Sequence, residues 1–247
     1  MFLEKICIKK FRNIDEANLE LNQKTNVIIG ENAAGKTSFL EAIDVLSRGR
    51  SFRTNKTENL IKDGENQLYV GAYEGTNKKK LEIEKAKKKT KILINNKEEA
   101  KQSKLAEELA IQSIHPNSHG LVEGAPSERR SFMDWGLFHV EQNFKNEWSA
   151  YTRLLKQRNE ALKIKDSEES VWKEKLAPIG ENITKLRQNY IDDLKEHLVY
   201  TQQEIMPDVE LEFYYDKGWP GKNSFIEALN ERVKLDTERG YTSCGPQ

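Results

Sequence analysis

The chain has 247 residues, and its 40 Lys and Arg balance its 40 Asp and Glu, so no net charge draws the whole chain to nucleic acid. Two cysteines are too few for a disulfide framework, and no run has the apolar length of a secretory signal or a membrane span. We therefore expect a cytoplasmic protein of one or two domains with no membrane partner.

The start of the chain predicts strands and a helix in the order typical of an α/β fold. Ile6 and Ile8 alternate along a strand at 2–11. Residues 24–29 end in the apolar run Val-Ile-Ile, which is typical of a strand buried on both faces. Helical spacing of apolar side chains then predicts a helix over 36–47, with its apolar positions at Phe39, Leu40, Ile43 and Leu46.

Further strands are expected over 68–95, with a hairpin turn at Asn95-Asn96. The segment 78–91 within them is rich in lysine. Such a run is either a face that contacts phosphates or a solvated hairpin, and the sequence leaves both open. The lysines at its centre are Lys87, Lys88 and Lys89.

Two helices dominate the later part of the chain. Apolar positions mark them at 144–162 and 172–198, and the polar link at 163–170 allows them to pack antiparallel. Pro178 inside the second pattern predicts either a kink or a helix start, because proline lacks the backbone donor that a helix interior needs.

The pattern divides the chain into a strand-rich domain, 1–138, and a helical domain, 139–247. Within the second domain, residues 209–214 are expected to form a strand and residues 224–234 a short helix. We expect the helical part to project from the strand-rich part, since the chain is hydrophilic for its size.

The turn before the first helix matches the pattern G-x-x-x-x-G-K-[ST], a phosphate-binding loop. A strand is predicted before it and a helix after it, as phosphate binding requires. Backbone N–H groups at the helix start hold phosphate, and the glycines let the backbone approach closely. The nucleotide-binding residues predicted from this match are Gly30, Glu31, Asn32, Ala33, Ala34, Gly35, Lys36 and Thr37.

Lys36 is expected to reach the β- and γ-phosphates, and the Thr37 hydroxyl to ligate Mg²⁺. Hydrolysis usually needs a strand that ends in Asp as well. No run of four apolar residues followed by Asp occurs downstream; the nearest candidates, at 60–63 and 132–134, are interrupted or too short. The sequence thus predicts a nucleotide site without a complete hydrolytic site.

Several further segments together carry a family resemblance. The segment Lys-Phe-Arg-Asn at 10–13 resembles the start of heads of the SMC, Rad50 and RecN group. The segment at 46–54 resembles the stretch that follows the phosphate-loop helix in the RecF family. Three later segments resemble further RecF motifs in the same order: G-x-P-x-x-R-R-x-F-L-D at 123–135, L-K-Q-R-N at 154–159 and G-Y-T-x-x-G-P at 240–246.

The resemblance implies an α/β fold: a P-loop ABC-type ATPase head with an inserted helical arm domain. It implies ATP and Mg²⁺ as cofactors, weak ATPase activity in the family and ATP-driven homodimerisation. It also implies binding to single-stranded DNA, gapped DNA or double-stranded junctions, with RecO and RecR as partners in loading RecA during repair and the SOS response.

The chain departs from the family pattern after Gly245-Pro246, where Gln247 is the last residue. The family continues with an S-G-G-Q signature and an apolar strand that ends in Asp-Asp. We therefore expect an incomplete, truncated head, and hydrolysis by this chain alone is not expected.

Other positions carry over from the family less directly. Arg12 and Asn13 are candidate nucleotide contacts or else a strand-end cap, and Gln112 lies where related ATPases keep a nucleotide-sensing loop. Arginines that could face DNA or ATP phosphates, or instead pair with surface acids, are Arg50, Arg53, Arg129 and Arg130.

Two other interpretations compete with a DNA-repair protein. A small P-loop kinase would also use the phosphate loop, but it would keep a metal-binding Asp close downstream and would not need paired arm helices. A poorly folding remnant would show no cooperative unfolding transition.

Overall fold

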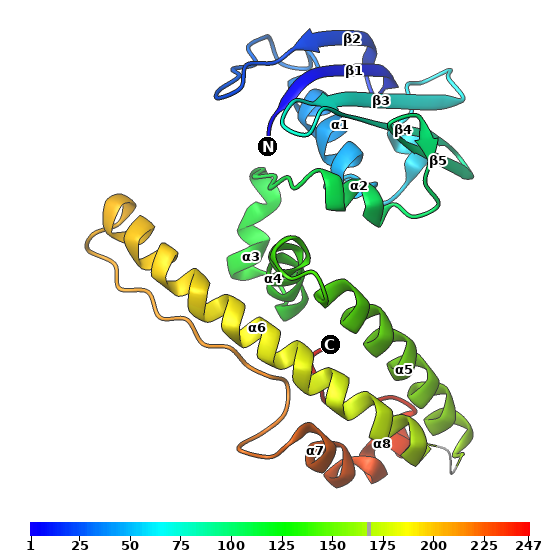
Figure 1. Ribbon diagram of the computed structural model, residues 1–247, viewed down its shortest axis with the longest axis vertical. Coiled ribbons are helices and arrows are strands. Elements are labelled where there is room, and N and C mark those ends of the chain that lie inside the picture. The colour runs from blue at the N-terminus through cyan, green and yellow to red at the C-terminus, as the bar shows by residue number, and fades with distance from the viewer. Residues whose placement is uncertain (167–168) are drawn as a thin grey trace. The chain divides into compact units, whose positions relative to one another are not determined.

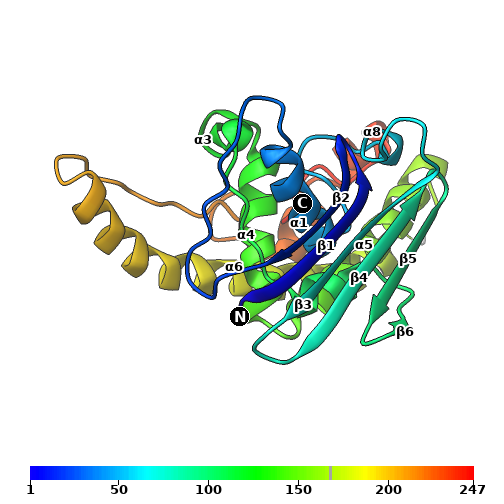
Figure 2. The same cartoon turned by 90° about the horizontal axis from the view of Figure 1, so that it is seen from above.

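Six antiparallel strands form the sheet of the first of two units in this computed structural model, which describes residues 1–166 and 169–247. The units are Met1–His115 and Pro116–Gln247. The strands lie in the order β2-β1-β3-β4-β5-β6 (Figure 2). Their bounds are β1 Leu3–Phe11, β2 Ile14–Glu20, β3 Gln67–Glu74, β4 Lys79–Ala86, β5 Lys89–Ile94 and β6 Lys97–Glu98.

The inner face of this sheet packs on helix α1, Lys36–Arg48, and on the short helix α2, Ser103–Glu108 (Figure 1). A 3₁₀ turn in this unit, η1, spans Thr57–Asn59. Strand alternation puts Ile6 and Ile8 into the core, as predicted. The shared core includes Phe39, Val45, Leu46, Val70, Leu81, Ile83 and Leu105.

Helix α1 ends at Gly49, whose φ of 68° is left-handed and suits glycine. The ammonium of buried Lys85 on β4 donates to the Gly49 carbonyl at 2.5 Å. Burial lowers the pKa of Lys85. This contact places a positive group at the negative end of the helix dipole and fixes the end of α1 that lies away from the phosphate loop.

The second unit is helical. Its two long helices, α5 Phe144–Ile164 and α6 Glu169–Ile205, run side by side and antiparallel, as predicted (Figure 1). They share a core that includes Leu137, Phe144, Tyr151, Leu176, Ile183 and Phe225. The other helices are η2 Pro116–His119, α3 Gly120–Glu123, α4 Pro126–Val140, α7 Phe225–Glu231 and α8 Val233–Arg239. Across the described residues, no helix combines the length and hydropathy needed to cross a membrane.

A buried ion cluster ties α5 to the end of the chain. Arg158 has a fully buried side chain; its Nη1 donates to Asp236 Oδ2 at 2.8 Å, and its Nε donates to Glu169 Oε1 at 2.7 Å. The same Nη1 donates to the Thr242 hydroxyl, which in turn donates to Asn159 Oδ1. The segments 154–159 and 240–246, singled out in the sequence, therefore meet in the helical core and hold it together.

A second arginine has a similar role. Arg187 on α6 makes a bidentate pair with Asp134 on α4, with both distances at 2.8 Å, and also donates to the carbonyl of Pro246. Asp134 belongs to the segment 123–135 that resembles the RecF family. Its carboxylate is thus engaged in helix packing.

Two predicted strands are absent. Residues 24–29 form an irregular segment that pairs with no strand among the described residues, and Val27 and Ile29 are 76% and 88% exposed. The Asn26 side chain bonds to both backbone groups of Asn22: its Oδ1 accepts from the Asn22 N–H, and its Nδ2 donates to the Asn22 carbonyl, which closes a local turn after β2. The segment 209–214 is likewise irregular and unpaired.

Other boundaries differ from the predicted ones. Strand β2 was not predicted, because its sequence is mostly polar and one strand edge is open. The predicted helix at 224–234 is two helices, α7 and α8. The unit boundary falls at His115, so α4 belongs with the helical unit, whereas the sequence division falls at 138.

Pro178 lies inside α6 and does not start it, because buried neighbours on either side pack the helix continuously. The predicted link 163–170 is short: α5 continues to Ile164 and α6 begins at Glu169, while residues 167–168 lie outside the described part. The predicted hairpin turn at Asn95-Asn96 is confirmed, with φ of 51° and 63°.

Candidate nucleotide-binding site

The phosphate loop, residues 30–37, runs into α1, whose first two residues are Lys36 and Thr37, and the Lys36 side chain returns to the start of the loop at Gly30. Gly35 is the N-cap residue of α1, with φ of 99°. Ala33 also adopts a left-handed φ, 65°, which a residue with a side chain rarely does. Strain of this kind is concentrated at functional sites.

The N-terminus of α1 is open to an anion. Gly35 supplies no side-chain cap, and the first turn holds no acidic residue. The first N–H groups of the helix therefore remain available, and the positive end of the helix dipole is not offset. This is the arrangement that holds phosphate groups at helix starts.

Lys36 and Thr37 complete the loop. Lys36 Nζ donates to the carbonyls of Gly30 and Glu31, at 2.7 and 2.8 Å, so the ammonium closes over the loop's own backbone. Thr37 is exposed, and its hydroxyl bonds to no described residue. No cluster of three His, Cys, Asp or Glu able to hold a metal occurs in the described ranges. A hydroxyl ligand fits Mg²⁺, which takes its remaining ligands from nucleotide phosphates and water.

Asn13 braces this loop. Its Nδ2 donates to the Ala33 carbonyl at 2.8 Å, and its Oδ1 accepts from the Ser38 hydroxyl at 2.8 Å. A Cβ added to Gly35 would lie 3.3 Å from the Asn13 amide nitrogen, so glycine at this position lets the Asn13 side chain pack closely against the loop. The structure thus places Asn13 against the loop, and its amide shapes the loop from the β1–β2 turn.

Arg12 lies beside Asn13 and is held by Glu41 on α1. The guanidinium makes two bonds to this carboxylate, Nε to Oε2 at 3.0 Å and Nη2 to Oε1 at 2.7 Å. Arg53 Nη1 reaches Glu41 Oε2 at 3.3 Å, and the Ser51 hydroxyl donates to Oε1. The sequence pattern did not single out Glu41 or Ser51. The signal that could have found Glu41 is an acidic residue placed between apolar residues of the predicted helix.

Gln112 is not brought to the loop. Its amide donates to the neighbouring Ser113 carbonyl at 3.3 Å. The Ser113 hydroxyl donates to Asp44, and the Ser47 hydroxyl donates to the Leu109 carbonyl at 2.6 Å. These bonds fix the Gln112 segment at the C-terminal half of α1, whereas the phosphate loop is at the other end.

The candidate DNA-binding residues fall into three places. Arg50 and the lysines 87–89 are exposed on the first unit, and the three lysines lie at the β4–β5 turn. None of these four side chains forms an ion pair with a described residue. Arg53 pairs with Glu41. In the second unit, Arg129 Nη1 caps α3 by donating to the Gly124 carbonyl at 3.0 Å, and Arg130 neighbours it on α4.

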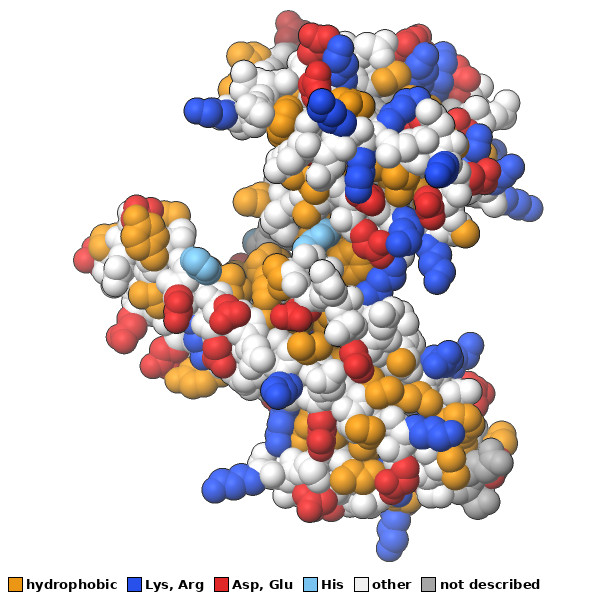
Figure 3. Space-filling view, viewed as in Figure 1, with side chains coloured by type: hydrophobic (Ala, Val, Ile, Leu, Met, Phe, Trp, Pro, Cys, Tyr) orange, Lys and Arg blue, Asp and Glu red, His pale blue; other side chains and the backbone are white. Residues whose placement is uncertain are grey.

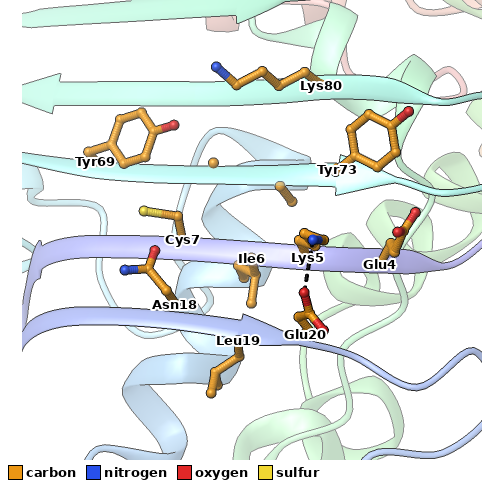
Figure 4. A pocket seen from close by; sticks show the side chains of 12 residues that line it. Glu4, Lys5, Ile6, Cys7, Asn18, Leu19, Glu20, Tyr69, Tyr73 and Lys80 are labelled. Carbon is orange, nitrogen blue, oxygen red and sulfur yellow. Dashed lines mark ion pairs between the residues drawn. The ribbon is translucent and has the colours of Figure 1, made fainter.

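A shallow groove of the first unit lies elsewhere, on the outer face of the sheet (Figure 4). Cys7 on β1 is paired with Gly71 on β3, and Tyr69 and Tyr73 come two residues before and after Gly71, with the Tyr69 hydroxyl lying over it. Lys5 pairs with Glu20 across the strands at 2.8 Å. The lining of the groove carries Glu4, Lys5, Glu20 and Lys80, so it offers no field of one sign. Basic and acidic side chains are also interspersed on the side of this unit that the space-filling view shows (Figure 3).

Known proteins resemble this chain along most of its length. The family model described as RecF/RecN/SMC N terminal domain matches residues 2–186. The DNA replication and repair protein RecF of Vibrio parahaemolyticus serotype O3:K6 (strain RIMD 2210633) is 36% identical over 252 residues, covering 100% of this chain and 70% of that protein. RecF of Shewanella loihica (strain ATCC BAA-1088 / PV-4) is 34% identical over 251 residues, with the same coverage of 100% and 70%.

A solved structure of the recombination mediator protein RecF-ATP in the RecFOR pathway is also similar, with a TM-score of 0.89 and 28% identity. The likeness covers 99% of this chain and 70% of that one. The mixed α/β fold is therefore that of an ABC-type ATPase head with a helical arm, as predicted. Because the family model and the relatives both match along the chain, it belongs to the RecF family of DNA replication and repair proteins.

Proposed function

We propose that this chain binds ATP with Mg²⁺ at the loop 30–37 and that the bound nucleotide controls its association with DNA. The observation that supports this most directly is the uncapped start of α1, with Lys36 and Thr37 at its first two positions. The solved RecF with which the chain shares its fold is described as bound to ATP.

Each loop group has a distinct task in this proposal. The N–H groups at the start of α1 hold phosphate oxygens, and Asn13 keeps the loop in shape through the Ala33 carbonyl. Lys36 exchanges its two carbonyl partners for the β- and γ-phosphates, so its ammonium moves from the loop backbone to the nucleotide. Mg²⁺, held by the Thr37 hydroxyl, would offset phosphate charge.

The DNA partner is single-stranded or gapped DNA, or a double-stranded junction, contacted through its phosphates. Arg50 and the lysines at 87–89 support this, since exposed cations without acidic partners are free to contact phosphates. By family membership we extend the proposal to an ATP-dependent homodimer that works in the cytoplasm with RecO and RecR to load RecA. Arg129 and Arg130 remain proposed contacts to DNA or ATP phosphates on the same basis, whereas Gln112 is not proposed as a nucleotide contact, because its segment is fixed at the C-terminal half of α1.

A binding assay with fluorescently labelled gapped DNA, with and without ATP and Mg²⁺, tests this function, and phosphate release in the same samples measures turnover. We expect ATP to strengthen DNA binding. Affinity that is equal with ATP, with ADP and without nucleotide would contradict the proposal.

DNA affinity is expected to fall steeply with salt, because phosphate contacts release counterions. Replacing Lys87, Lys88 and Lys89 together by alanine should weaken binding and make the log–log salt slope shallower by about 2–3, measured between about 50 and 200 mM salt. The control replaces three exposed lysines of the helical unit, and it should leave the slope within about 1 of the wild-type value. The control lysines are Lys185, Lys222 and Lys234.

A further inference from the structure

Glu41 is a buried carboxylate that gathers cationic side chains from two other segments. It is 0% exposed. Arg12 comes from the β1–β2 turn, and Ser51 and Arg53 come from the loop after α1. Both carboxylate oxygens are engaged, which is the condition under which a buried charge is tolerated.

The cluster lies on the same face of α1 as the end of the phosphate loop. Thr37 and Glu41 are four residues apart, so their side chains point from one face, about 6 Å apart along the axis. Asn13, the neighbour of Arg12, contacts the loop at Ala33 and the helix at Ser38. Both arginines are therefore held about one helical turn from the Thr37 position on α1.

Both arginines keep donors to spare. Glu41 takes the Nε and Nη2 of Arg12 but leaves its Nη1, and it takes only one nitrogen of Arg53. The side chains are 22% and 45% exposed. Arg12 holds an unusual φ of 55°, and its N–H bonds to the Leu60 carbonyl at 2.8 Å, so the turn is fixed on both sides.

We propose that Glu41 is a positioning residue: it fixes Arg12 and Arg53 as a paired guanidinium contact for the terminal phosphate of the bound nucleotide. The inference rests on the proposed function. The loop backbone holds the phosphates that ATP and ADP share. The paired arginines add positive charge at the position that only the third phosphate of ATP reaches. Glu41 thereby sets the preference for ATP over ADP.

The test measures the Kd of ATP and of ADP, each with Mg²⁺, for the full chain and for Glu41→Gln. Glutamine keeps the size of the side chain but cannot hold two guanidinium groups. We expect the ATP Kd to rise at least about tenfold and the ADP Kd less than about threefold. A ratio of the two constants unchanged within about twofold, with ATP still bound, would overturn the inference.

Asp44→Asn is the matched control, because Asp44 is a second buried acid on α1 but contacts Ser113 and Arg48. It should keep the wild-type ratio. An equal loss of ATP preference in this control would show that any charge removed from α1 acts alike, which would also overturn the inference.

Arg53→Ala covers the case in which Glu41→Gln does not fold, since Arg53 is exposed enough to be removed safely. Arg53→Ala should also lower the preference for ATP over ADP. Where Glu41→Gln folds, combining it with Arg53→Ala should change this preference little further, because the arginine pair is already broken. Full ATP preference in Arg53→Ala would overturn the inference. If the wild-type chain binds neither nucleotide, the proposed function itself fails, which is a separate outcome.

Discussion

Arg158→Ala is expected to lower the free energy of unfolding of the helical unit by about 3–5 kcal/mol. The change leaves Asp236, which is 0% exposed, without its cationic partner, and it removes a donor to Glu169 and Thr242. An uncompensated buried charge costs more than a lost surface pair, because the low dielectric around it no longer holds an opposite charge.

Urea unfolding followed by tryptophan fluorescence measures this effect. The four tryptophans, at 135, 148, 172 and 219, all belong to the second unit, so the signal reports that unit alone. Arg153→Ala on the same helix is the control: its side chain is exposed, and a change within about 0.5 kcal/mol is expected. A loss below about 1 kcal/mol in Arg158→Ala would show that Asp236 finds water or another partner.

Arg158→Met sharpens the same experiment. Methionine fills much of the arginine volume but carries no charge, so packing is largely kept while Asp236 stays unpaired. If this variant is as unstable as Arg158→Ala, charge is the cause; if it is near wild type, lost packing is the cause.

Lys36→Ala is expected to raise the ATP Kd at least about hundredfold while leaving the fold intact. In the nucleotide-free loop the ammonium bonds only to the carbonyls of Gly30 and Glu31, both in exposed backbone, so its removal costs little stability. In the nucleotide complex the same ammonium would face two phosphate groups, where charge-assisted bonds are strong.

Isothermal titration with ATP and Mg²⁺ measures the binding, and far-ultraviolet circular dichroism checks the sheet, since the first unit holds no tryptophan. Lys24→Ala, another exposed lysine just before the loop, should bind ATP as the wild type does. Tight ATP binding by Lys36→Ala would mean that the nucleotide site lies elsewhere in the chain.

The phosphate loop could be predicted because its chemistry is contiguous. Backbone N–H groups, a lysine and a hydroxyl must follow one another at the start of a helix, so one short pattern contains the site. The same holds for α1, whose start at Lys36 and end before Gly49 both carry local signals.

The cluster around Glu41 could not be predicted in this way. It joins residues from three segments, and only tertiary packing brings them together. Helical spacing predicted Leu40 on the buried face of α1, yet Leu40 is 53% exposed while Glu41 is 0% exposed. The other predicted positions, Phe39, Ile43 and Leu46, do lie in or against the core, so the pattern identified the buried side of the helix but not the polar residue that tertiary packing places on it.

The strand predicted at 24–29 failed for a related reason. An apolar, β-branched run predicts a strand only if another strand lies alongside to take its backbone bonds, and none of the described residues does so. Packing partners, which lie far away along the chain, decide whether such a run is paired.

That open segment has a consequence for the chain in solution. Val27, Ile28 and Ile29 combine exposed β-branched side chains with unpaired backbone groups, which are the properties of a template for intermolecular strand pairing. Self-association, and with it the solubility limit of the purified chain, should therefore begin at the residues that lead into the phosphate loop.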